Sequence, residues 1–428
     1  MFHLIFQLCL TPIVSDSSFY LLGDWGLNGL EQTAVRNAMV HKANSMAKSP
    51  STTAVLSLGD NFYPTGVTST SDPLWESAWS SIYTFPFSDV NWYAILGNHD
   101  YGNVNSPEAE LSFDAPQHNW IMPDYNYVEY FCGGQRSFRT SPCSSDLVAI
   151  VFIDAPRLAP YESSSAIETI LNMCDGDEVC VEGMASDTYS KIEDLLEGVD
   201  RTEGVDWLFV SGHYGLFSIG KHGTHDSDNN NRAVDVLPQR LLPLLQKFNV
   251  DAYFFGHDHL MQHLQTDDIC FIGSGSGAKL DKINFPDLKG KRFGAEAPGF
   301  VYLTVHPDTK LATTEWWGFD VEDDSCVDDD NDKCVPVGNE KLLYSFTLRS
   351  KRNGGSEYTQ VHDYYPKNKI GAFKITFGVI ALVLLVPCCL CVRAVKNSYV
   401  AKWDKQYRKQ QFQKLAEMND AEFEIGNL

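Results

Sequence analysis

The sequence has too little positive charge to bind nucleic acid. Its 428 residues include 33 Lys and Arg against 56 Asp and Glu, which gives a formal net charge of −23. A protein that neutralises phosphates needs a basic surface, so nucleic acid is excluded as a partner. The chain also has no Asn-X-Ser/Thr sequon, no internal repeat and no Pro-, Gly- or Ser-rich linker. With 43% hydrophobic residues it can bury a large core, and we expect one domain over residues 18–350.

Long apolar runs occur only at the two ends of the chain. Residues 1–17 are typical of a secretory signal peptide, although a buried first strand is the alternative. Residues 373–392, FKITFGVIALVLLVPCCLCV, match the ~20 residues that cross a bilayer, and a buried core helix is the alternative. Residues 351–372 would form a polar stalk. Lys and Arg dominate the start of residues 393–428, which predicts a cytosolic tail by the positive-inside rule.

These segments predict a single-pass type I membrane protein. Its main domain would be extracellular or lumenal, at the plasma membrane or in an acidic vesicle, where thiols oxidise. Six cysteines allow fifteen pairings. Short separations favour Cys132 with Cys143, Cys174 with Cys180 and Cys326 with Cys334, and they leave Cys270 as a buried free thiol.

Seven short apolar runs lie between the two end segments, and each is followed by a Gly-centred turn with polar residues. Such runs predict buried strands. Intervening stretches predict helices over residues 30–47, 74–83, 185–197 and 233–247. Strands alternating with helices indicate an α/β fold, here with two packed sheets, and three later runs predict a closing β meander. The seven runs are FYLLGDWG, TAVLSLGDNFY, NWYAILGNHD, DLVAIVFIDAP, DWLFVSGHYG, DAYFFGHDH and ICFIGSGSG.

Metal-binding side chains follow five of these runs, at the edge of the sheet where ligands bind in α/β folds. A lone Asp or His at such a place is usually a turn former, helix cap or satisfied core residue. Five sites at one sheet edge indicate a metal centre, because carboxylates and imidazoles bind zinc, iron and manganese. Two adjacent ions need a bridging carboxylate, which Asp60 can provide. Such a pair can bind a phosphate ester and activate water, while His99 protonates the leaving alcohol. The candidate residues are Asp24, Asp60, Tyr63, Asn98, His99, His213, His257 and His259.

The blocks GDWG, GDNFY, GNHD, GHYG and GHDH, in this order, closely resemble the five motifs of purple acid phosphatases, within the metallophosphoesterase superfamily. Size and spacing are most similar to the small, mammalian-type (tartrate-resistant) branch, over residues 18–320. The resemblance implies a calcineurin-like four-layer α/β/β/α sandwich of two mixed sheets flanked by helices. It also implies a binuclear centre of Fe(III) and a second divalent metal, Fe, Zn or Mn. Fe(III) would be bound by Asp24, Asp60, Tyr63 and His259. The second metal would be bound by Asp60, Asn98, His213 and His257.

The resemblance also implies two catalytic histidines. His99 matches the substrate-binding and proton-donating His of the family, and His222 in KHG matches a further active-site His. Two departures concern the surroundings of His222. Lys221 stands where the small enzymes usually have Glu, and GHYG replaces the more usual GHYP.

Tyr63 distinguishes this family from its superfamily. The first block is usually Asp-X-His elsewhere, and GDWG lacks that His. A phenolate from Tyr63 would replace it and favour Fe(III) over a softer divalent ion.

Three alternative functions are compatible with these observations. The first is a membrane-anchored acid phosphatase that hydrolyses phosphate monoesters by attack of a metal-bound hydroxide. Fe(III) acidifies its bound water strongly, so we expect activity at low pH. The second is a zinc or manganese nucleotidase or phosphodiesterase of the same superfamily. The third is a catalytically dead adhesion or receptor module, for which loss of a ligand would be expected, yet all seven ligand positions are occupied. The sequence leaves the substrate, the second metal and the oligomeric state open.

Overall fold

The computed structural model describes residues 15–45, 52–115, 118–137, 143, 145–223, 233–266, 269–321 and 336–352. All of them belong to one compact unit that ends at Pro366. Within these ranges no helix combines the length and the apolar character that a bilayer crossing requires. The predicted membrane helix (373–392), the tail (393–428), nearly all of the stalk and residues 1–14 of the leader lie outside the described residues.

One β-sheet joins the first strands of the chain to the last. Among the described residues its order is β15 (Pro336–Arg349), β14 (Leu311–Val321), β13 (Gly299–His306), β1 (Ser17–Leu22), β2 (Ala54–Ser57), β3 (Trp92–Ala94) and β4 (Trp120–Ile121). Strands β1, β2 and β3 are parallel, so their carboxyl ends meet at one edge. Strands β13, β14 and β15 pair antiparallel, which confirms the predicted closing meander.

The second sheet contains the middle of the chain. In the described residues its order is β12 (Lys291–Ala295), β10 (Met261–Thr266), β11 (Ile269–Ser274), β9 (Ala252–Phe255), β8 (Val205–Ser211), β7 (Leu147–Phe152), β5 (Tyr127–Cys132) and β6 (Gln135–Ser137). Strands β7, β8, β9 and β11 run parallel in its centre, and antiparallel strands flank them. Both sheets are therefore mixed, as the sequence predicts.

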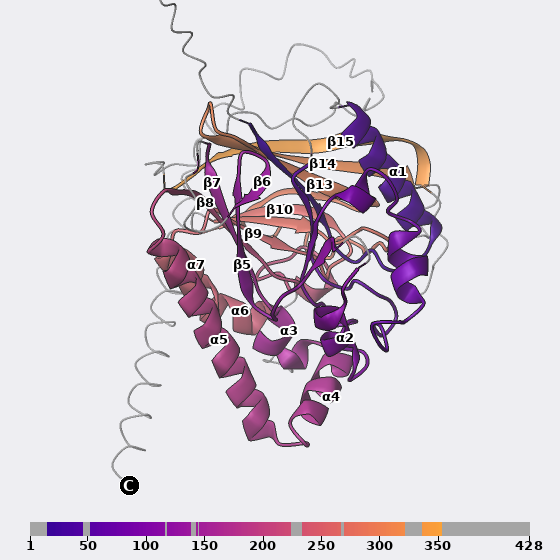
Figure 1. Ribbon diagram of the computed structural model, residues 1–428, viewed down its shortest axis with the longest axis vertical. Helices are drawn as coiled ribbons and strands as arrows, with labels where there is room; N and C mark the ends of the chain where they lie inside the picture. The colour runs from indigo at the N-terminus through magenta and orange to yellow at the C-terminus, as the bar shows by residue number, and fades with distance from the viewer. Residues whose placement is uncertain are drawn as a thin grey trace, which may run out of the picture. The chain divides into compact units, whose positions relative to one another are not determined.

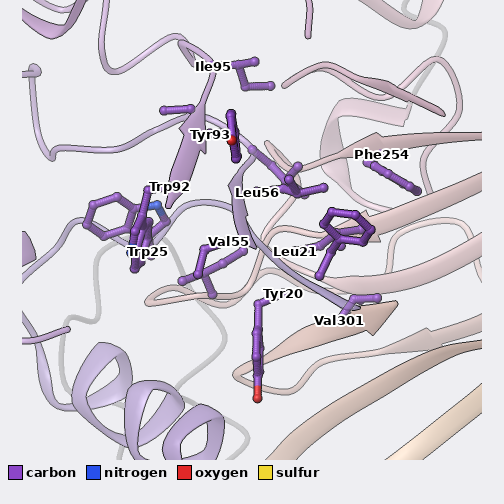
Figure 2. Close-up of a cluster of buried hydrophobic side chains, with 14 of the residues drawn as sticks. Tyr20, Leu21, Trp25, Val55, Leu56, Trp92, Tyr93, Ile95, Phe254 and Val301 are labelled. Carbon is purple, nitrogen blue, oxygen red and sulfur yellow. The ribbon is translucent and has the colours of Figure 1, made fainter. Parts of the chain in front are cut away.

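Apolar side chains of the two sheets form the main core (Figure 2). Leu21 of β1 and Leu56 of β2 lie there with Phe254 of β9, and all three are fully buried. Alternation along a strand divides its side chains between two faces. In β7, Ile150 belongs to this core, whereas Val151 belongs to a second core on the other face of the sheet.

Helices cover the outer faces of both sheets (Figure 1). The helix α1 (Leu30–Ser45) packs on β13, β14 and β15, and Tyr20 of β1 donates a hydrogen bond to the carbonyl of Met39. The second core lies under α5 (Glu178–Asp200), α6 (Ala233–Arg240) and α7 (Leu242–Lys247). The α/β/β/α sandwich is thereby confirmed. The remaining helical segments are the π-helix η1 (Trp75–Ser80), η2 (Phe87–Asp89), α2 (Ser106–Ser112), α3 (Ala155–Leu158), η3 (Pro160–Glu162), α4 (Ser164–Met173) and η4 (Lys221–Gly223).

Two predicted disulfides are present. Cys132 pairs with Cys143 and Cys174 with Cys180, while Cys270 is a buried free thiol. The predicted pair of Cys326 and Cys334 lies outside the described residues.

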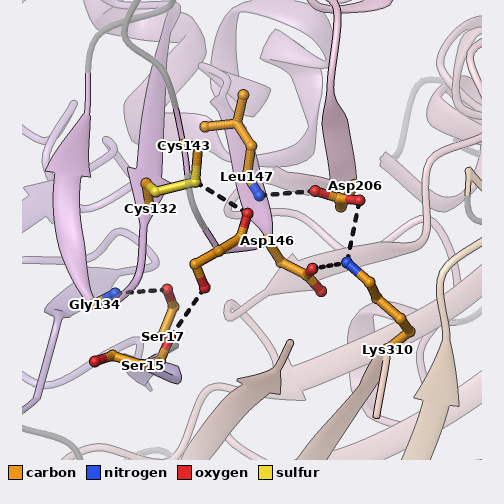
Figure 3. Close-up of a disulfide and its surroundings, with 10 residues drawn as sticks. Ser15, Ser17, Cys132, Gly134, Cys143, Asp146, Leu147, Asp206 and Lys310 are labelled. Carbon is orange, nitrogen blue, oxygen red and sulfur yellow. Dashed lines mark hydrogen bonds and ion pairs between the residues drawn. A yellow bond between two sulfur atoms is a disulfide. The ribbon is translucent and has the colours of Figure 1, made fainter. Parts of the chain in front are cut away.

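The first disulfide lies beside the start of the fold (Figure 3). Ser145 donates a hydrogen bond to the carbonyl of Ser15 (3.1 Å), and the amide of Gly134 donates to Ser17 Oγ (3.0 Å). Ser15 and Ser17 therefore already belong to the folded domain, although the sequence assigns them to the leader. The leader itself stays a prediction.

Candidate metal centre

The predicted ligands come from the carboxyl ends of parallel strands in both sheets. In the first sheet Asp24 follows β1, Asp60 and Tyr63 follow β2, and Asn98 follows β3. In the second sheet His213 follows β8, and the histidines of GHDH follow β9. The strand pattern predicts all of them at the edge of one sheet, and this prediction is wrong. They lie at the edges of two sheets, which meet because the sheets pack face to face.

Strained backbone positions three of these residues. Asp24, Asp60 and His257 have φ angles of 57°, 52° and 68°. This left-handed conformation is uncommon for residues other than Gly and costs on the order of 1 kcal/mol or more, so it persists only where the surroundings impose it. A Cβ atom on Gly97 would lie 2.2 Å from Asp60 Oδ1, which explains the Gly of GNHD.

A first group of ligand atoms surrounds the hydroxyl of Tyr63. Asp60 Oδ2 is 3.0 Å away, Asp24 Oδ1 3.2 Å and His259 Nε2 3.3 Å. All four residues are buried. Three oxygens and one imidazole nitrogen thus converge on one small volume, as a hard metal ion requires.

A second group surrounds His213 Nε2. Asp60 Oδ1 is 3.4 Å away and Asn98 Oδ1 3.2 Å. The ring of His257 lies 5.2 Å from that of His213, centroid to centroid. Asp60 therefore offers one carboxylate oxygen to each group, and Asp24, Asp60 and His213 have the geometry of a metal-binding set.

The electrostatics of the centre fit bound cations. Burial, together with the charge of Asp60, raises the pKa of Asp24 and of Tyr63 well above the ordinary values. Without a cation these acidic groups cannot all be charged, and a metal ion reverses that balance. Burial lowers the pKa of His213 and His257. Both imidazoles are therefore neutral and have a lone pair to offer.

Each predicted ligand histidine has one ring nitrogen close to a protein oxygen. His213 Nδ1 lies 2.8 Å from the carbonyl of Leu58. His259 Nδ1 lies 3.3 Å from Asp281 Oδ2, and His257 Nε2 lies 3.3 Å from Glu162 Oε1. Metal-bound histidines usually donate their second N–H to such an oxygen. These contacts leave the other nitrogen of each ring available to a metal ion.

The two predicted catalytic histidines flank the ligand groups. His99 Nδ1 lies 2.6 Å from the carbonyl of Pro64, and its Nε2 lies 4.0 Å from Asp60 Oδ2. The side chain of His99 is one-third exposed, so a substrate can reach it. His222 Nδ1 lies 2.8 Å from Glu162 Oε1. Burial opposes protonation of His222, but the contact with Glu162 favours it. On balance the pKa of His222 is raised.

Glu162 and Asp281 are residues that sequence reasoning missed. Glu162 lies in PYESSS and Asp281 in KLDK, and neither segment has a recognisable pattern. Lys221 stands where the small enzymes usually have Glu, and Glu162 is the residue that offers a carboxylate to His222 here. Lys221 instead forms an ion pair with Asp281 (3.2 Å).

The two-sheet fold and the ligand groups at its strand ends define a metal-dependent phosphoesterase domain. A family model described as calcineurin-like phosphoesterase matches residues 17–261. Purple acid phosphatase 7 of Arabidopsis thaliana is 34% identical over 295 residues, which cover 68% of this chain and 78% of that protein. Tartrate-resistant acid phosphatase type 5 of Sus scrofa is 31% identical over 331 residues, 71% of this chain and 83% of that protein. The chain belongs to the purple acid phosphatases, within the calcineurin-like phosphoesterase family.

Among solved structures, the fold is similar to that of GAP50, described as the anchor in the inner membrane complex of Plasmodium. The TM-score is 0.55 at 21% identity, over 71% of this chain and 85% of that one. This likeness concerns the fold alone.

Proposed function

We propose that this chain is a membrane-anchored acid phosphatase that hydrolyses phosphate monoesters at a binuclear metal centre. The placement of Asp60 carries the proposal. Its Oδ2 lies 3.0 Å from the hydroxyl of Tyr63, and its Oδ1 lies 3.4 Å from His213 Nε2. One buried carboxylate thus faces both ligand groups, which is what a bridge between two ions requires.

We assign Fe(III) to the first group, because this group offers a phenol and two carboxylates. The second group would hold iron, zinc or manganese through Asp60, Asn98, His213 and His257. When bound, the two ions supply Lewis acidity toward the phosphate ester and an activated water as the nucleophile.

Two histidines would act on the substrate. We assign to His99 the transfer of a proton to the leaving alcohol, since Pro64 holds its Nδ1 and leaves Nε2 to face the substrate. We assign to His222 the binding of phosphate. The raised pKa of His222 favours its cationic form, which attracts an anionic ester.

Membrane attachment rests on residues 373–392, with the catalytic domain extracellular or lumenal and the tail cytosolic. Protease treatment of sealed vesicles should leave the domain intact and remove the tail when the cytosolic face is outside. Degradation of the domain instead would contradict this orientation.

Turnover of p-nitrophenyl phosphate across pH tests the activity. The wild-type chain should hydrolyse it best at acidic pH, and Asp60→Asn should lose at least a hundredfold in kcat because the shared carboxylate is lost. Asp308→Asn, a surface control, should match the wild type. A wild type that holds two metals yet shows no turnover would contradict the enzyme and favour the binding module.

A further inference from the structure

We infer that Glu162 is a positioning residue for the second metal alone, and that Asp281 has the same role for the first. The inference rests on the proposed function, because it assumes that both metals are bound. The new element is that each metal has a separate carboxylate, which orients one of its ligand histidines.

The carboxylate of Glu162 is fixed from both sides. Its side chain has no solvent exposure. Oε1 lies 2.8 Å from His222 Nδ1 and 3.3 Å from His257 Nε2. Oε2 accepts a hydrogen bond of 2.7 Å from the amide of Ala233, the first residue of α6. A carboxylate held in this way restricts the His257 ring and leaves Nδ1 as the nitrogen that can bind the second metal.

The contact between Glu162 and His257 also affects the ring as a ligand. A carboxylate that accepts the N–H of a ligand histidine makes that ring a stronger donor to the metal.

The segment that holds Glu162 contacts a further ligand of the second metal. Glu162 ends η3, and α4 begins two residues later. In α4, Ser165 Oγ donates a hydrogen bond of 3.4 Å to the carbonyl of Asn98. One short segment, residues 160–165, therefore contacts both His257 and Asn98.

The first group is supported from a different part of the chain. Asp281 lies after β11, and its Oδ2 accepts a hydrogen bond of 3.0 Å from the amide of His259. The same oxygen lies 3.3 Å from His259 Nδ1. Asp281 thus contacts a ligand that faces Tyr63, in addition to its ion pair with Lys221. Glu162 instead contacts a ligand that belongs to the second group.

The test measures the two metals separately. The full chain in detergent is purified as wild type, Glu162→Gln and Asp281→Asn, and each is dialysed against increasing concentrations of a chelator. Elemental analysis gives the total metal, and the visible absorption of Fe(III) bound to Tyr63 reports the first metal. Glu168→Gln, an exposed residue of α4, is the matched control.

Glu162→Gln should lose the second metal at roughly 10- to 100-fold lower chelator concentration than the wild type, with the visible absorption intact. Asp281→Asn should lose the first metal, and with it the visible absorption, before it loses the second metal. Glu168→Gln should follow the wild type. If Glu162→Gln does not fold, Glu162→Asp gives the same test, because its carboxylate is one methylene too short to keep all three contacts.

Retention of the second metal at wild-type chelator concentrations by Glu162→Gln would overturn the inference. Equal loss of both metals would overturn it too, because a merely structural role would weaken both sites together. A wild type without two metals or without visible absorption contradicts the proposed function itself, whatever the variants do.

Discussion

At the scale of the single residue, the proposed choice of metal depends on Tyr63. Its hydroxyl lies within 3.3 Å of atoms of Asp24, Asp60 and His259. Burial and the charge of Asp60 raise the pKa of this phenol, so only a cation can make it ionise at ordinary pH. A strongly charged ion such as Fe(III) meets that requirement better than a divalent one.

Replacing Tyr63 by Phe should therefore remove the visible absorption of the iron-loaded protein. We expect the variant to fold, because the buried ring is kept and the change deletes one oxygen. Absorption spectra of the oxidised protein, with Tyr189→Phe on α5 as the control, measure the effect. Persistence of the band in Tyr63→Phe would place the iron elsewhere.

His99 should affect turnover and leave the metals in place. Its Nδ1 contacts the carbonyl of Pro64, its Nε2 lies 4.0 Å from Asp60, and its ring lies 4.4 Å from that of Tyr63, centroid to centroid. It therefore lies beside the first group rather than within it. Loss of a general acid typically lowers the rate 10²- to 10⁴-fold. We expect His99→Asn to lower kcat by about that factor while elemental analysis and the visible band match the wild type. Loss of iron from this variant would instead make His99 a ligand.

The sequence identified candidate ligands that the structure brings close together, but it did not identify the residues that support them. All seven ligand positions follow Gly-centred turns, which single-chain patterns reveal. Asp100 stands in the GNHD motif, yet its role is visible only in the structure, where it accepts the amides of Gly97 (2.8 Å), Asn61 (2.8 Å) and Phe62 (3.1 Å). These partners belong to two loops, and no local pattern connects them. Glu162 was missed for the same reason, because its partners His222 and His257 lie in other segments of the chain.

At the scale of the element, α5 begins at a specific cap. Asp177 precedes the helix in an extended conformation, and its side chain accepts a hydrogen bond of 2.9 Å from the amide of Val179. Loss of such a cap typically costs about 1 kcal/mol. We expect Asp177→Ala to lower the free energy of unfolding by about that amount. Urea unfolding measures it, and Asp187→Ala, within the same helix, should leave stability unchanged or slightly higher.

Strands with continuous apolar runs were predictable, whereas short and polar ones were not. The seven predicted runs correspond to β1, β2, β3, β7, β8, β9 and β11. The two-residue β4 and the strand β10, MQHLQT, carry no such signal because neighbouring strands define them. The predicted helix over residues 233–247 is two helices, α6 and α7. Pro243, in the first turn of α7, lacks the N–H that one continuous helix would need.

At the scale of the whole molecule, one contact between the two sheets involves the buried side chain of His263. His263 of β10 stacks on Trp316 of β14, and its Nδ1 lies 3.1 Å from the hydroxyl of Tyr344 on β15. Burial, together with the charge of Arg292, lowers the pKa of His263 from 6.5 to about 3. The packing of the two sheets therefore requires the neutral ring, in a protein that we expect to work at acidic pH.

The stability of the two-sheet core should fall as the pH falls from 6.5 toward 3. Above pH 6.5 neither state protonates His263, so its full contribution is present. Below that value the unfolded chain binds a proton that the folded state excludes, which costs up to about 5 kcal/mol near pH 3. Urea unfolding of the full chain from pH 7 to pH 4 should show this decline, and His263→Phe should reduce its slope. His41→Phe, at an exposed histidine, should keep the wild-type slope. An unchanged slope in His263→Phe would mean that other groups govern acid stability.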